Sequence, residues 1–263
     1  MTESKTAAVE RRDGRGPDVP RPVKFLPHFI KTAEGSVLVT VGETRVICTA
    51  SVENRLPKFL RDGGQGWITA EYSMIPRATD VRTSRESSRG RVSGRTHEIQ
   101  RLIGRSLRTI THLPAIGERT IWIDCDVIQA DGGTRTASIT GAFVALVLAL
   151  DHMRRNRVIH TAPLKGAVAA TSVGMVGGRA LLDLTYEEDC VAEVDMNVIG
   201  TDRGDYVEIQ GTGERSPFTP EDLKTLLKLA DRGMETLFEA QRGVLEGILP
   251  PLLRDRPAAS PGS

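Results

Sequence analysis

The chain has 263 residues, is 39% hydrophobic and carries a formal net charge of +1. That length and apolar content suffice to bury a full core, while the net charge excludes a protein that binds nucleic acid through a globally basic surface. The longest apolar run, residues 142–150, is too short to span a bilayer, and residues 1–20 are too polar for a secretory segment. We therefore expect a soluble, cytoplasmic protein with no membrane contact.

In the first half of the chain, β-rich runs are followed by helical patterns. Gly42-Glu43 separates two β-rich runs and is a two-residue hairpin signal. Ile99, Leu102 and Ile103 begin an apolar stripe at helical spacing, and a later helix is apolar nearly all round, which predicts that it is buried. The predicted elements are strands at 36–41, 44–52, 67–74 and 120–129 and helices at 97–110 and 137–154.

The second half repeats this order in shorter form. Its last helix is opened by Thr219 as N-cap, Pro220 at the first position and Asp222 three residues after the cap. Strands are expected at 166–176, 180–185, 191–199 and 206–210. Strands then helices, twice, predict an α+β fold built from two related β-α halves.

We divide the chain accordingly. The two halves are expected at residues 21–155 and 156–249. The polar residues 1–20 and the Pro-rich residues 250–263 are expected to be mobile ends.

Residues 131–138, Asp-Gly-Gly-Thr-Arg-Thr-Ala-Ser, run directly into the buried helix of the first half. The paired glycines allow a tight turn, and the first amides of a helix have no internal partner and carry the positive end of its dipole. Arg135 can hold two oxygens of one phosphate group. We therefore expect an anion at Gly133, Thr134 and Arg135; a capped helix start without a ligand is the alternative.

A second cationic segment lies at residues 77–108, where nine arginines and three acids give a local charge of +6. Arg95 follows Ser93-Gly94 at a helix entry, where backbone amides can also meet an anion. Arg101, Arg105 and Arg108 lie opposite the apolar stripe of that helix, and there an ordinary solvated face is the simpler interpretation.

A polar, Arg-rich loop precedes that helix. Its arginines include Arg77, Arg82 and Arg85. A mobile loop of this kind suits a phosphate backbone better than a core, which predicts contact with a phosphate backbone. A subunit interface is the competing explanation.

Residues 183–195 hold six acids and no base. Even positions of residues 190–199 are apolar, and odd positions include Glu193 and Asp195, which predicts a strand with one acidic face. Asp189 shares the parity of Asp195, but a straight strand would separate them by about 20 Å. A shared metal ion or proton therefore requires a turn near Asp189; acids that only face solvent are the alternative.

The remaining residue types exclude several other chemistries. Cys48, Cys125 and Cys190 lie far apart in apolar, strand-like contexts, so we expect buried, reduced thiols. The five histidines lack the spacing of a zinc site. The chain has no P-loop, no dinucleotide-binding glycine motif and no nucleophile elbow.

Several long motifs together resemble the ribonuclease PH family of phosphate-dependent exoribonucleases. The resemblance extends from Arg21-Pro22 to about Leu237 and is carried by residues 33–39, 64–72, 94–96, 98–103, 124–138, 195–198 and 208–212. It implies a pair of related β-α units, similar to a ribosomal-protein domain, that assembles as a homohexameric ring, a trimer of dimers.

The resemblance also implies roles for individual residues. Inorganic phosphate would be bound by Arg95 and by the triplet Gly133, Thr134 and Arg135. Two aspartates, Asp189 and Asp195, would serve metal-assisted catalysis with Mg²⁺. RNA would be held by Arg77, Arg82 and Arg85.

The implied activity is that of a phosphorolytic 3′–5′ exoribonuclease and nucleotidyltransferase. Such an enzyme trims the 3′ ends of tRNA precursors and of other RNAs, uses phosphate to release nucleoside diphosphates, and can add nucleotides in reverse. A catalytically silent RNA-binding ring subunit is the alternative. A hydrolytic nuclease would leave the phosphate cradle without a function, and a scaffold would explain neither charged patch.

Overall fold

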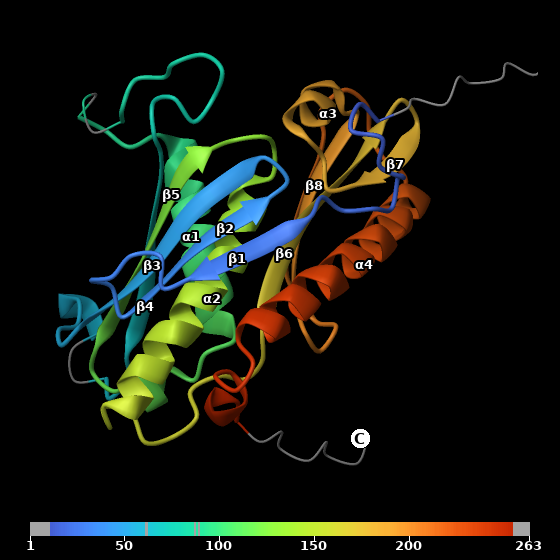
Figure 1. Ribbon diagram of the computed structural model, residues 1–263. Coiled ribbons are helices and arrows are strands. Elements are labelled where there is room, and N and C mark those ends of the chain that lie inside the picture. The colour runs from blue at the N-terminus through green and yellow to red at the C-terminus, as the bar shows by residue number, and fades with distance from the viewer. Residues whose placement is uncertain (1–10, 61–62, 87, 89, 255–263) are drawn as a thin grey trace, which may run out of the picture.

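The computed structural model describes residues 11–60, 63–86, 88 and 90–254. It contains two sheets, each with helices packed on it, arranged as two units that lie beside one another (Figure 1). The predicted α+β class with two β-α halves is therefore confirmed.

The first unit is a five-stranded sheet with two helices. The strand order is β1-β2-β3-β5-β4, antiparallel except that β4 runs parallel to β5. Helix α1 packs on β4, and α2 packs on β2 and β3. The elements are β1 (Val23–Pro27), β2 (Gly35–Val41), β3 (Thr44–Glu53), β4 (Trp67–Met74), α1 (Gly94–Thr109), β5 (Thr120–Gln129) and α2 (Thr134–Arg155).

The second unit is a four-stranded antiparallel sheet in the order β7-β6-β8-β9. Helix α4 lies along β6 and β7 and is opened by the predicted cap, since Thr219 accepts from Asp222 N and Asp222 caps Thr219 in return. The elements are β6 (Val168–Val176), β7 (Arg179–Leu182), α3 (Tyr186–Val191), β8 (Val194–Thr201), β9 (Tyr206–Gly213) and α4 (Pro220–Val244).

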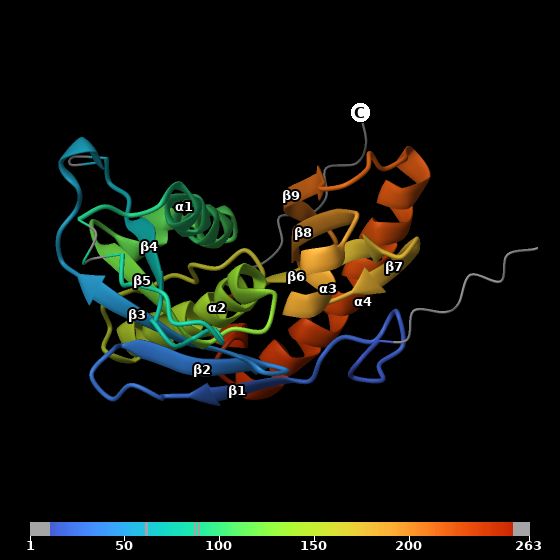
Figure 2. The same ribbon diagram turned by 90° about the horizontal axis from the view of Figure 1, so that it is seen from above.

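Helix α2 joins the two units, because it packs on the first sheet and also on β6 of the second (Figure 2). It is the one helix of the described residues that is long and apolar enough to cross a membrane, yet its most apolar window is 94% buried inside the protein. It is therefore the core helix, as its all-round apolar pattern predicted.

The prediction for residues 190–199 was wrong at its start. Residues Tyr186–Val191 form the short helix α3, and the strand begins only at Val194. Thr185 caps this helix by accepting from Glu188 N, and Glu188 caps Thr185 in return. Cys190 is consequently exposed on α3, whereas Cys48 and Cys125 are buried as expected.

The chain ends also differ from the predicted mobile segments where they are described. Residues 11–20 pack on the second unit: Arg11 is only 5% exposed, and Leu182 N donates to Pro17 O at 2.8 Å. At the other end Leu252 is fully buried, and Leu164 N donates to its carbonyl. The expectations for residues 1–10 and 255–263 lie outside the described residues.

Candidate active site

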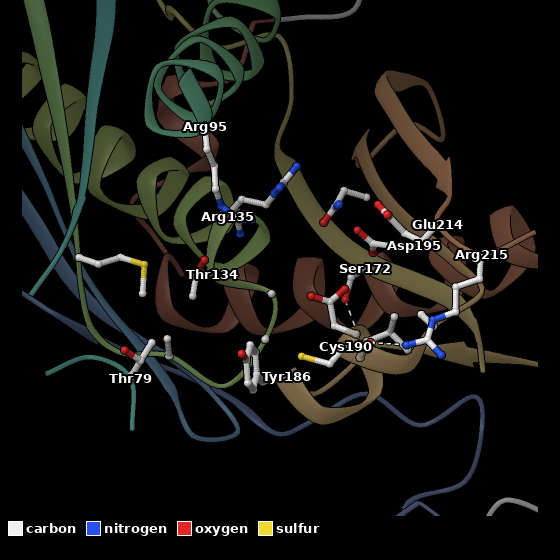
Figure 3. A pocket seen from close by; sticks show the side chains of 18 residues that line it. Thr79, Arg95, Thr134, Arg135, Ser172, Tyr186, Cys190, Asp195, Glu214 and Arg215 are labelled. Carbon is white, nitrogen blue, oxygen red and sulfur yellow. Dashed lines mark hydrogen bonds between the residues drawn. The ribbon is translucent and has the colours of Figure 1, made fainter. Parts of the chain in front are cut away.

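A cavity of about 600 Å³ lies between the two units, and its lining includes six residues singled out from the sequence. They are Arg95, Gly133, Thr134, Arg135, Asp189 and Asp195. In Figure 3, Arg95 and Arg135 reach in from the first unit, and Asp195 stands across from them on the second. The proposed phosphate ligands and the proposed carboxylate pair thus share one cavity.

The loop before α2 is shaped as its glycines predicted. Gly132 and Gly133 have φ of +69° and +61°, a left-handed region that favours glycine, and Gly133 is the N-cap of α2. No described side chain caps this helix start. Its first amides are therefore available to an anion, in the positive field of the helix end.

Thr134 is held by a residue to which the sequence assigned no role. The hydroxyl of Tyr72, a residue only 6% exposed on β4, donates to Thr134 Oγ1 at 2.9 Å. Burial raises the pKa of Tyr72, which keeps the phenol protonated as a donor. This bond fixes the orientation of the Thr134 hydroxyl at the cavity wall.

The two cavity arginines come from the first turns of different helices. Arg95 is the second residue of α1, which begins at Gly94 rather than at 97 because Ser93 accepts from Thr96 N. Arg135 is the second residue of α2, and its Nη1 donates to Gln210 Oε1 at 3.1 Å. Glu98 lies 3.9 Å from Arg135, so this guanidinium is oriented by neighbours from both units.

The two aspartates come from different elements of the second unit, Asp189 from α3 and Asp195 from β8. The helix supplies the turn that a shared site requires. Burial raises the pKa of Asp189, and burial together with the charge of Asp189 raises the pKa of Asp195 to about 6. Arg135 and Arg95 partly counter both rises, so all four charges act on one another across the cavity.

A buried arginine links the loop before α2, residues 131–133 (the proposed phosphate loop), to the segment that precedes α3. Arg21, 5% exposed, binds the Asp183 carboxylate through Nη2 at 2.6 Å and Nε at 2.9 Å. Its Nη1 donates to the carbonyl of Asp131, directly before the two glycines. Arg11 adds a second tie, because its Nε and Nη2 both donate at 2.8 Å to Glu188, the capping residue of α3.

The loop arginines lie away from this arrangement. Arg77, Arg82 and Arg85 are exposed and are not among the residues that line the cavity. Arg77 Nη1 donates to the carbonyl of Asp80 within the loop, at 2.7 Å. The geometry of one chain therefore leaves both explanations of this loop, RNA and a subunit interface, as predictions.

The solvated-face interpretation of α1 holds for Arg101 and Arg105, which are both exposed, although Arg105 also pairs with Glu208 of β9. It fails for Arg108, which lies 4.4 Å over the ring of Trp67 and donates to Ile68 O. Arg101 and Arg105 line a smaller cleft of about 310 Å³ between α1 and β9.

Sequence reasoning missed several residues that line the cavity. Cys190 was assigned to a strand and Tyr186 to no element, and Glu214 and Arg215 lie two and three residues beyond the matched motif at 208–212. Glu214 contributes to the raised pKa of both aspartates, and Arg215 donates to the carbonyl of Cys190 at 3.0 Å. The capping pattern Thr-x-x-Glu at 185–188 was the signal that could have placed α3 and hence these side chains.

The carboxylate pair suits Mg²⁺. This ion commonly takes one or two protein carboxylates and completes its octahedral shell with water and substrate phosphate oxygens. Asp189 and Asp195, both at the cavity wall, would supply two such ligands. In the part of the chain that is described, no three His, Cys, Asp or Glu side chains form a complete protein cage for a metal ion.

Comparison with known proteins shows the family of this chain. The chain matches the 3′ exoribonuclease family, domain 1, over residues 20–150 and domain 2 over residues 166–233. Ribonuclease PH of Bacillus velezensis is 61% identical over 243 residues, which cover 92% of this chain and 99% of that protein. Ribonuclease PH of Syntrophomonas wolfei is 54% identical over 237 residues, which cover 90% and 99%.

Solved structures share the fold at low identity. The crystal structure of rice Rrp46 has a TM-score of 0.73 at 19% identity and covers 90% of this chain and 100% of its own. The Archaeoglobus fulgidus exosome with RNA bound to the active site has a TM-score of 0.73 at 22% identity and covers 88% and 92%. With both domain matches and these close relatives, the chain belongs to the 3′ exoribonuclease family.

Proposed function

We propose that this chain is a phosphorolytic 3′–5′ exoribonuclease that trims the 3′ ends of tRNA precursors and other RNAs. Inorganic phosphate is the attacking group, nucleoside diphosphates are the products, and the reverse reaction adds nucleotides to a 3′ end. One observation carries the proposal: the start of α2 and two arginines face Asp189 and Asp195 across a single cavity. A nuclease that uses water has no need of the phosphate ligands. A catalytically silent RNA-binding subunit needs neither these ligands nor the aspartate pair.

The proposed reaction explains why arginines line the cavity. Both the attacking phosphate and the phosphodiester it attacks are anions, and two unit charges at 4 Å repel by about 4 kcal/mol at an effective dielectric of 20. Left unscreened, that repulsion would slow the reaction roughly a thousandfold. Arg95, Arg135 and the amides that follow Gly133 would offset it and orient the attacking oxygen.

The bond changes are those of a displacement at phosphorus. A phosphate oxygen forms a bond to the phosphorus of the terminal nucleotide, and the bond from that phosphorus to the 3′ oxygen of the preceding nucleotide breaks. That 3′ oxygen takes up a proton and becomes the new chain end. A magnesium ion held by Asp189 and Asp195 would stabilise negative charge on the reacting phosphate oxygens.

The rest of the RNA would be held outside the cavity. Arg77, Arg82 and Arg85 lie in one exposed loop, which suits contacts with a flexible single strand. We further propose that the protein works as a homohexameric ring, a trimer of dimers, in the cytoplasm. Support for a ring comes from the similarity to subunits of exosome assemblies.

The decisive experiment incubates the protein with 3′-labelled RNA, with and without phosphate. We expect nucleoside diphosphates only when phosphate is present; monophosphates in its absence would indicate a hydrolase instead. Arg95→Ala and Arg135→Ala should each lower the rate about a hundredfold, the usual cost of losing one preorganised donor, and should leave RNA affinity nearly unchanged. If both variants saturate with phosphate as the unaltered protein does, phosphate binds elsewhere.

A further inference from the structure

Tyr186 combines two properties that no other described side chain shares. It is a large apolar side chain that is 60% exposed, and it lines the cavity that holds the proposed phosphate ligands and the aspartates. The other exposed large apolar side chains of the described residues lie outside that lining. An aromatic ring exposed to solvent at the wall of a polar cavity offers an apolar face on which a ligand can pack.

The ring is held at a fixed place relative to the cradle. Tyr186 N donates to Asp131 Oδ1 at 3.3 Å, so the first residue of α3 is bonded to the start of the phosphate loop. The backbones are so close that a Cβ on Gly132 would lie 2.5 Å from Leu184 O and 2.8 Å from Tyr186 N. Since nothing larger than glycine fits at Gly132, the loop and the start of α3 lie in direct backbone contact.

The other end of α3 carries the carboxylate. Asp189 follows Tyr186 by three residues, which places both on neighbouring positions of one helical face. In Figure 3 the ring of Tyr186 stands between the labelled side chains of Thr79 and Cys190, at the edge of the cavity below Thr134. The ring therefore lies at the edge of the cavity, on the same short helix as a proposed metal ligand.

We propose that Tyr186 is the stacking platform for the base of the 3′-terminal nucleotide, an inference that rests on the proposed phosphorolytic function. The nucleotide whose phosphorus is attacked must lie between the cradle and the aspartates, and Tyr186 is the exposed aromatic ring beside both. An exonuclease meets all four bases in turn. Contact with the face of a base serves all four, whereas hydrogen bonds to base edges would select among them.

The test compares Tyr186→Ala with Tyr186→Phe, which keeps the ring and loses only the hydroxyl. Tyr206→Ala is the matched control, because Tyr206 is also exposed, lies on β9 outside the cavity lining and bonds Asp231 instead. In the reverse reaction, where the lone nucleotide is a substrate, Tyr186→Ala should raise KM for ADP about 5- to 100-fold, the range found for removing one base–aromatic stack. The Phe variant and the Tyr206 control should leave KM for ADP unchanged, and KM for phosphate should be unchanged in all three.

A second arm identifies the base. RNA with an abasic 3′-terminal nucleotide should react equally with the unaltered protein and with Tyr186→Ala, whereas intact RNA should separate them. The proposal is overturned if Tyr186→Ala keeps its KM for ADP, if Tyr186→Phe is as impaired as Tyr186→Ala, or if the loss accompanies a change of oligomeric mass in sedimentation, which would make Tyr186 an interface residue. An unaltered protein that forms no diphosphates would overturn the proposed function itself.

Discussion

At the scale of single residues, Asp195 is the most perturbed carboxylate of the cavity. Burial and the neighbouring Asp189 raise its pKa to about 6, above the ordinary value of 3.8. Only the ionised carboxylate can hold a divalent cation. We therefore expect metal-dependent activity to rise as pH increases through about 6, measured as kcat/KM for RNA at saturating phosphate.

The same shift has the opposite effect on stability. Because the folded-state pKa exceeds the unfolded one, the stabilising contribution of Asp195 is present below about pH 4 and is lost as pH rises through about 6. In the presence of a chelator, Asp195→Asn should therefore raise Tm at pH 8 and leave Tm nearly unchanged at pH 4. In a separate assay with metal present, the same substitution should abolish activity. An equal shift of Tm at both pH values would show that ionisation of Asp195 does not cause it.

Residue identities were predictable where chemistry and spacing coincide. A glycine pair before a Thr-Arg helix start predicted Gly133, Thr134 and Arg135 at an anion site, and all three line the cavity. Tyr72 was not predictable, because it sits in a strand and alternation assigns its side chain to the core. Only the structure shows its hydroxyl reaching Thr134 from that buried position.

At the scale of elements, residues 11–21 hold the loop before α2 and the segment before α3 in place. Arg21→Ala would leave the carboxylate of Asp183 buried with only Arg15, at 3.6 Å, as a charged partner. Breaking a buried pair of this kind costs about 3 kcal/mol or more. We expect that loss in the free energy of unfolding by urea, together with a lower kcat, since Arg21 also holds the phosphate loop.

Arg12→Ala is the matched control for Arg21→Ala. Arg12 pairs with Glu187 at the surface, where its side chain is 82% exposed. Exposed ion pairs contribute about 0–1 kcal/mol, so this variant should unfold nearly as the unaltered protein does. If the two variants lose stability equally, the buried pair is not what fastens the segment.

Element boundaries were predictable in regular segments and failed at α3. Strands β4 and β5 lie at the predicted residues, because β-branched and aromatic residues recur along both. In residues 190–199 an alternating pattern was extended across Cys190, a helical residue that shares the parity of the true strand. Periodicity cannot mark where one element gives way to the next, whereas the cap at Thr185 and Glu188 does.

At the scale of the whole molecule, the net charge of +1 results from opposed patches rather than from neutrality. Arginines of α1, α2 and the preceding loop lie in the first unit, and the acids of α3 and β8 lie in the second. Folding brings the two sets to one cavity while it leaves the loop arginines exposed. The sequence predicted both patches, but their meeting depends on how α2 joins the two sheets, which no local pattern encodes.

The exposed loop gives a prediction at this scale. Replacing Arg77, Arg82 and Arg85 together by alanine should weaken RNA binding and flatten its salt dependence, by about 0.7 in log–log slope per lost single-strand phosphate contact. Binding titrations across salt concentrations measure the slope, and sedimentation measures the oligomeric mass. An unaltered slope with a smaller assembly would favour the subunit interface and contradict RNA binding by this loop.

The docking of residues 11–21 onto residues 182–188 also bears on biosynthesis. The beginning of the chain is made first, yet Arg11 and Arg21 also need acceptors in a segment made roughly 160–180 residues later. A polypeptide still on the ribosome, or truncated before Asp183, has the phosphate loop but neither its fastening nor the aspartates. We therefore expect chains that are still incomplete to have no RNA-degrading activity until most of the message has been translated.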